Sequence, residues 1–280
     1  MSISVNQQAR GAIRVASPWI EWLARLGFAA KGVVYALIGV LAVQYAFGQG
    51  GEATGTTGAL ETIAGGPFGQ IILGLIALGL VGYSIWQFVR AGMDADNKGS
   101  DAVGLIKRIG YFCNGIIHLG LAGIAAGLAI GAMSGSSGGN STIAEWTASL
   151  MSQPFGRWLV GIGGAIVIGV GVYRIYKGYS MEFQKKLNLS QMSDAERKWT
   201  IRLGRAGLAA QGIVFAMIGS FFVQAAVQYD PNEARGLGGA LQSLAQQPYG
   251  PWLLAIVALG LVAHGVYNFI LSQYRRIETT

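Results

Sequence analysis

Six apolar stretches alternate with polar segments along the chain. They lie near residues 26–47, 68–89, 109–132, 156–178, 206–228 and 251–273. Each has roughly the 20 predominantly apolar residues that a helix needs to cross a bilayer. The pattern therefore predicts an all-α integral membrane protein with six transmembrane helices.

The apolar stretches also recur as three similar pairs. The first helices of the pairs open on related sequences at Arg25–Tyr35, Arg108–His118 and Arg205–Phe215. The second helices begin at Pro67-Phe68-Gly69, Pro154-Phe155-Gly156 and Pro248-Tyr249-Gly250. Self-similarity at both ends of a unit indicates tandem copies. We predict three two-helix repeats, which are able to close around a pseudo-threefold axis.

With these motifs, the chain resembles a bacterial membrane family known as domain of unknown function 1206, over roughly residues 20–275. The resemblance implies three tandem two-helix units and a bacterial source, and it implies no activity. We divide the chain accordingly, into an N-terminal segment, three repeats and a tail: residues 1–19, 20–94, 95–182, 183–275 and 276–280.

Composition supports a membrane location. Charged residues make up 12% of the chain, Gly counts 44, and mean hydropathy is +0.45. Soluble proteins carry about 25% charged residues, whereas glycine is frequent in membrane helices. The single cysteine, Cys113, excludes an internal disulfide and a cysteine-based metal cluster.

The segments between the apolar stretches predict several local features. The connection within each pair is rich in Gly, Ser and Thr and predicts a loop, as at 48–58 and 131–142. Ser17 and Pro18 predict the start of a short surface helix, and Ser193 with Glu196 predicts a capping box. Prolines that precede the second helices suit a first helical turn, and the aromatic residues beside them predict an interfacial belt. The prolines are Pro67, Pro154 and Pro248, and the aromatic residues are Phe68, Phe155, Trp158, Tyr249 and Trp252.

Positive charge predicts the orientation. Most of the 20 lysines and arginines lie in the termini and in the two connections between pairs, including Arg90, Lys98, Arg275 and Arg276. The three connections within pairs hold only Arg157 and Arg235. By the positive-inside rule, both termini are cytoplasmic in a bacterial inner membrane. The same distribution explains the net charge of +7 by attraction to anionic lipid headgroups rather than by nucleic acid.

Polar residues recur at matching positions inside the spans. Lys31, Asn114 and Gln211 share one position on the first helices, about 9 Å from the cytoplasmic end at 1.5 Å per residue. Gln87, Arg174 and Asn268 share a position on the second helices. One turn deeper lie Tyr35, His118 and Phe215 on the first helices, and Tyr83, Val170 and His264 on the second. We call the first six residues the polar layer.

Two interpretations of the polar layer stay open. Its side chains either link helices, with Lys31 and Arg174 reaching toward the headgroups, or line a wet pocket or pathway. A further interpretation uses the only two histidines, His118 and His264, as ligands of a haem. Asn114 and Asn268, four residues from each, are placed to orient their rings. Other copies carry Tyr, Phe or Val at the histidine positions, which favours packing.

No motif indicates chemistry. The sequence has no nucleotide-binding loop, nucleophile motif or paired metal ligands, so we expect no catalytic residues, no metal and no resident cofactor. The favoured function is non-enzymatic and acts through membrane lipids or a membrane-protein partner. The alternatives are a small-solute channel, carrier or ligand-binding protein that uses the polar layer, with Tyr35, Tyr83 and the histidines as contacts, and a haem protein.

Overall fold

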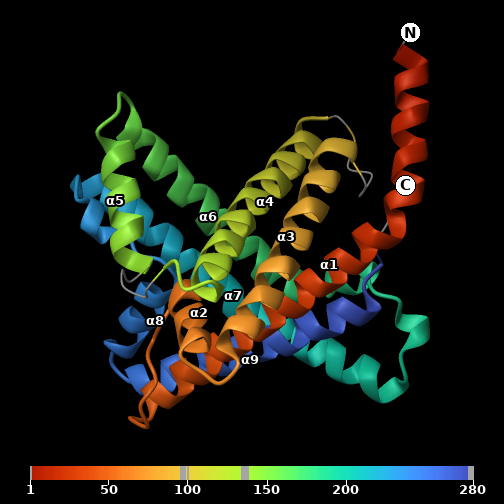
Figure 1. Ribbon diagram of the computed structural model, residues 1–280. Helices are drawn as coiled ribbons and strands as arrows, with labels where there is room; N and C mark the ends of the chain where they lie inside the picture. Colours follow the sequence, from red (N-terminus) through yellow and green to blue (C-terminus); the bar gives the residue numbers. More distant parts are fainter. Residues whose placement is uncertain (1, 95–98, 100, 134–138, 277–280) are drawn as a thin grey trace. The chain divides into compact units, whose positions relative to one another are not determined.

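The computed structural model describes residues 2–94, 99, 101–133 and 139–276 (Figure 1). For residues 2–17, 20 and 139 it describes the backbone alone. Lys98 and most of the predicted C-terminal tail lie outside the described residues.

Over these residues the chain forms nine α-helices and three short 3-10 helices, with no strand. Six α-helices are long and apolar enough to span a membrane: α1 (Ser2–Ala46), α3 (Gly69–Met93), α4 (Ala102–Ala129), α6 (Gly156–Tyr179), α7 (Asp194–Gln228) and α9 (Gly250–Tyr274). They cover the six predicted apolar stretches, which confirms the all-α, six-span prediction.

The chain divides into two compact units. Unit 1 comprises residues 1–31, 66–133 and 268–280, and unit 2 comprises residues 32–65 and 134–267. Unit 1 contains α3 and α4, which pack along each other (Figure 1). Unit 2 contains α6 and α7, which pack in the same way. Helices α1 and α9 each contribute residues to both units.

The connections within the pairs differ from the predicted loops. Each carries a short helix: α2 (Thr56–Ala64), α5 (Gly139–Met151) and α8 (Leu237–Ala245). Ala59 and Leu60 of α2 and Ala240 and Leu241 of α8 are fully buried. Burial of this small apolar face stabilises helices that glycine-rich sequence alone does not predict.

The prolines before the second helices lie in a turn, not in the first helical turn as predicted. Gly156 N–H donates to Gln153 O at 2.9 Å and Gly250 N–H to Gln247 O at 2.7 Å. Phe68, Phe155 and Tyr249 adopt left-handed φ values of 59°, 63° and 60°. A proline followed by a residue of positive φ is typical of a type II turn, and the helix begins after it.

The aromatic residues of these turns point away from the protein. Phe68, Phe155 and Tyr249 are 78%, 81% and 82% exposed, and Trp158 and Trp252 are exposed as well. Exposed aromatic rings at the ends of apolar spans are typical of the membrane interface, and the interfacial belt stays a prediction.

Two predicted helix starts have opposite outcomes. Ser193 caps α7, because its Oγ accepts from Glu196 N–H while Glu196 bonds back to Ser193 N–H, which confirms the capping box. The start at Ser17 is wrong, because α1 runs without a break from Ser2 and contains Pro18. A proline removes one backbone hydrogen bond, and the helix on either side keeps the others.

The connection that follows α6 continues as η1 (Glu182–Lys186) and η2 (Leu189–Gln191), and η3 (Pro231–Glu233) follows α7. Phe183 of η1 is buried, and its ring centroid lies 5.5 Å from that of Tyr267.

Glycines bring α6 and α7 into backbone contact. A methyl group on Gly171 would lie 2.6 Å from Gly212 O, and one on Gly164 would lie 2.7 Å from Gly219 O. By contrast, Gly169 on the same helix has open space around it. Close approach at small residues is how membrane helices associate where lipid removes the hydrophobic driving force.

Candidate functional site: the polar layer

The second helix of each copy packs against the first helix of the next copy. This holds for α3 with α4 and for α6 with α7. Within unit 2 it also holds for α9 with α1, where a methyl group on Gly265 would lie 2.6 Å from Ala36 N and one on Gly39 would lie 2.6 Å from Ala258 O. Four residues of the polar layer lie along these contacts between copies: Gln87, Asn114, Arg174 and Gln211.

In unit 1, Tyr83 links three elements. Lys31 Nζ donates to Tyr83 Oη at 3.2 Å and lies 4.2 Å from the centroid of its ring. On the other side, the ring centroids of Tyr83 and His118 are 4.7 Å apart. Tyr83 is buried, whereas Lys31 and His118 are half-buried. Lys31 therefore binds another helix rather than only reaching for the headgroups.

One turn away, Gln87 bridges α3 and α4. Its Nε2 donates to Asn114 Oδ1 at 2.9 Å, and its Oε1 accepts from Arg90 Nη1 at 2.5 Å. Arg90 is only 7% exposed and its guanidinium lies 3.6 Å from the ring centroid of Tyr111. The prediction that Arg90 lies in a connection between pairs is wrong, because α3 extends to Met93 and contains it. Its side chain is part of the buried polar network. The sequence signal that separates Arg90 from the cations of the connections is its position before the end of α3.

In unit 2, Gln211 is the corresponding bridge. Its Oε1 accepts a short hydrogen bond from Arg174 Nη1, and its Nε2 donates to Tyr35 Oη at 2.9 Å. Gln211 is 2% exposed. Arg174 also lies over the ring of Phe215, 4.8 Å from the centroid. Both polar groups of the Gln211 amide are thus used in contacts between helices.

The two histidines differ in their surroundings. His118 Nδ1 lies 2.8 Å from the backbone oxygen of Asn114, so the backbone, and not the predicted side-chain amide, orients its ring. His264 is buried with its ring 4.9 Å from that of Tyr35, edge to face. A methyl group on Gly207 would lie 2.6 Å from His264 Cα. His264 is thus packed as an aromatic core residue.

These contacts follow one register. Gln87 pairs with Asn114 and Arg174 with Gln211, at equivalent positions in successive copies. One turn deeper, Tyr83 meets His118 and His264 meets Tyr35, again at equivalent positions. Asn268, the third-copy counterpart of Gln87, is 2% exposed. The structure thus brings four of the six polar-layer residues together in two pairs between copies, which sequence periodicity alone does not establish. Lys31 instead binds Tyr83 of its own copy.

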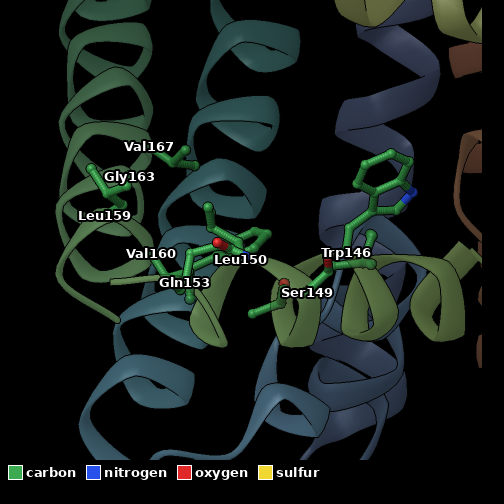
Figure 2. Close-up of a pocket in the computed structure, with 11 residues that line it drawn as sticks. Trp146, Ser149, Leu150, Gln153, Leu159, Val160, Gly163 and Val167 are labelled. Atoms are coloured by element: carbon green, nitrogen blue, oxygen red, sulfur yellow. The ribbon is translucent and has the colours of Figure 1, made fainter. Parts of the chain in front are cut away.

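A groove lies elsewhere, in unit 2. It has a volume of about 680 Å³, and its walls come from α5, α6 and Phe222 of α7 (Figure 2). No residue of the polar layer lines it. Among the described residues, no three His, Cys, Asp or Glu side chains gather as metal ligands.

Six apolar spans and a repeated pattern of contacts between copies define a multi-pass helical membrane protein built from tandem repeats. A sequence model of the family described as Domain of Unknown Function (DUF1206) matches residues 26–94, 109–180 and 206–275. The chain belongs to this family, and the three matches confirm the tandem repeat. It is 37% identical over 260 residues to the uncharacterized protein YxxB of Bacillus subtilis (strain 168), covering 93% of each chain. No solved structure matches the chain.

Proposed function

We propose that this protein is a non-enzymatic component of a bacterial inner membrane that acts through lipid or membrane-protein partners, and that its polar layer links the three repeats. The observation that carries the proposal is the pairing of Gln87 with Asn114 and of Arg174 with Gln211. Polar side chains that hydrogen-bond to one another between helices are not available to bind a solute. A solute pathway needs polar groups that face an open space.

Three features support this interpretation. The layer residues Gln87, Gln211 and Asn268 are at most 3% exposed. The groove of unit 2 is lined by other residues, which carry no charge. His264 packs as a core aromatic residue, which supports a protein without haem.

The orientation forms part of the proposal, with both termini in the cytoplasm. Basic residues such as Lys185, in the connection between α6 and α7, and Arg202, in the first part of α7, are exposed and are available to anionic headgroups. A green fluorescent protein fused to the C-terminus tests the orientation, because it fluoresces when it folds in the cytoplasm. Fluorescence is expected, and a dark fusion that is nevertheless inserted contradicts the orientation.

The function is tested by replacing Lys31, Asn114 and Gln211 together by Leu. Four hydrogen bonds between side chains are lost, to Tyr83, Gln87, Arg174 and Tyr35. At about 0.6 kcal/mol per bond in a membrane bundle, we expect a loss of about 2 kcal/mol of unfolding free energy or more. Proteoliposome swelling in a panel of small solutes is expected to be equally slow before and after substitution.

The matched control replaces three exposed apolar residues on the same helices: Val40→Leu, Ile117→Leu and Ile213→Leu. This variant is expected to keep wild-type stability, because these side chains face lipid. Solute flux in the wild type that disappears in the polar-layer variant, with the fold intact, contradicts the proposal and favours a channel or carrier.

A further inference from the structure

The groove of unit 2 is an apolar trough open on one side. Leu159, Gly163 and Val167 follow one another along α6, and Trp146 stands on α5 across the opening (Figure 2). None of the residues that line it carries a charge, and the polar ones, including Ser149 and Gln153, belong to α5 and the segment that follows it. The trough therefore has a polar end near α5 and an apolar length along α6.

The depth of the trough fits one leaflet. From Gly156, where α6 begins, to Val167 is about 16 Å along the helix axis at 1.5 Å per residue. The hydrocarbon core of a bilayer is about 30 Å thick, so the trough extends from the interface to about the middle of the membrane. At this depth it is filled by apolar material and not by water.

The trough belongs to the second copy of the repeat. Where copies one and three carry a buried Ala-Leu pair in α2 and α8, α5 carries Trp146 and Thr147. Trp146 is 75% exposed, whereas Thr147 is 4% exposed. An indole does not fit the space that an alanine fills in the other copies, so the side chain stands outside and forms one edge of the trough.

A positive charge at the polar end is also unique to this copy. Arg157 lies two residues before Leu159, where the other copies have Gln70 and Pro251. Its Nε donates to Ala226 O at 2.7 Å and its Nη2 to Val227 O at 3.3 Å, and its Cζ lies 4.2 Å from the ring centroid of Tyr229. The guanidinium is thus fixed at the end of α7, one turn beyond Phe222 of the trough. Arg157 does not line the trough itself, and it brings a positive charge to the start of α6, two residues before the lining residue Leu159.

We propose that the trough binds one phospholipid with an anionic headgroup, from the leaflet that adjoins α5. One acyl chain lies along Leu159, Gly163 and Val167, and the phosphate meets Arg157. The uncharged lining and the fixed positive charge of Arg157 near its polar end complement such an amphiphile. This inference rests on the proposed function, in which the protein acts through lipid partners, and it specifies the lipid and its binding site.

The test is native mass spectrometry of the full chain, delipidated in detergent and then offered phosphatidylglycerol or phosphatidylcholine. We expect one retained phosphatidylglycerol per chain and lower retention of phosphatidylcholine. Gly163→Phe fills the trough and is expected to lower lipid retention about tenfold. This is the factor expected when about two methylenes of the acyl chain lose their contacts with the protein. Gly169→Phe is the matched control, because both glycines have open space around them and only Gly163 lines the trough.

Arg157→Gln tests the headgroup. It is expected to remove the preference for phosphatidylglycerol over phosphatidylcholine, whereas Arg157→Lys and the control Arg235→Gln keep it. If Gly163→Phe does not fold, Val167→Phe takes its place. Unchanged lipid retention in the Gly163→Phe or Val167→Phe variant overturns the proposal. A dimer of the wild-type protein that either variant abolishes also overturns it, because the trough would then hold a second copy of the chain. Either failure leaves unchanged the stability and solute flux of the variant with Lys31, Asn114 and Gln211 replaced by Leu. The two proposals can therefore fail separately.

Discussion

Replacing Gln87 by Leu is expected to destabilise the protein more than replacing Asn114 by Leu. Gln87 is 3% exposed and makes two side-chain hydrogen bonds, to Asn114 and to Arg90. The Asn114 side chain contributes only the first of these two bonds, and its backbone oxygen still meets His118 after substitution. The difference between the two variants is therefore the bond from Arg90.

The magnitudes follow from the kind of bond. A hydrogen bond between membrane helices contributes about 0.6 kcal/mol on average and about 1.7 at most. A bond from a charged donor contributes about 1.5–3 kcal/mol. We expect a loss of about 0.6–1.7 kcal/mol of unfolding free energy for Asn114→Leu and about 2–5 kcal/mol for Gln87→Leu.

The assay is a double-mutant cycle from reversible unfolding in mixed micelles. The double variant is expected to lose less than the sum of the single variants, with a coupling energy of about 0.6 kcal/mol or more. Ile85→Leu and Ile117→Leu, at exposed positions on the same two helices, supply the uncoupled control pair. Additive losses within about 0.3 kcal/mol would refute the reasoning that these side chains link α3 to α4.

Three further substitutions test other parts of the structure. Gly171→Ala is expected to destabilise by about 1–3 kcal/mol, because the methyl group meets the α7 backbone, whereas Gly169→Ala, in open space, does not; thermal unfolding of both variants compares them. Tyr35→Phe removes the hydroxyl that accepts from Gln211 and is expected to lower unfolding free energy by about 0.6 kcal/mol without altering flux. Ser193→Ala removes the cap of α7 and is expected to destabilise by about 0.5–2 kcal/mol, with faster amide exchange confined to the first turn.

Hydropathy and internal similarity predict the spans well, because a membrane helix is specified by a long apolar run. They predict less well where a short segment depends on its neighbours. Helix α2 forms because Ala59 and Leu60 are buried, and glycine-rich sequence does not show that burial. The start at Ser17 fails for the opposite reason, because a proline compatible with a first turn also fits inside the continuous α1.

The members of the polar layer are predictable by repeat position, and their partners are not. Spacing places Gln87 and Asn114 at equal depth, yet any of several helices can face either side chain. Burial of Arg90 has no sequence signal beyond its distance from the end of α3. For the trough of unit 2, the one sequence signal in its lining is Trp146, which stands where the other copies have alanine.

Water access to the polar layer tests the central claim most directly. In a Cys113→Ser background, Gln211→Cys is exposed to a charged, membrane-impermeant thiol reagent in open membrane fragments, with Ser190→Cys, an exposed position between α6 and α7, as the accessible control. If the layer links helices, the cysteine at position 211 stays unmodified while the control reacts completely. Modification at position 211 at a rate similar to the control would show a wet pathway and contradict the account.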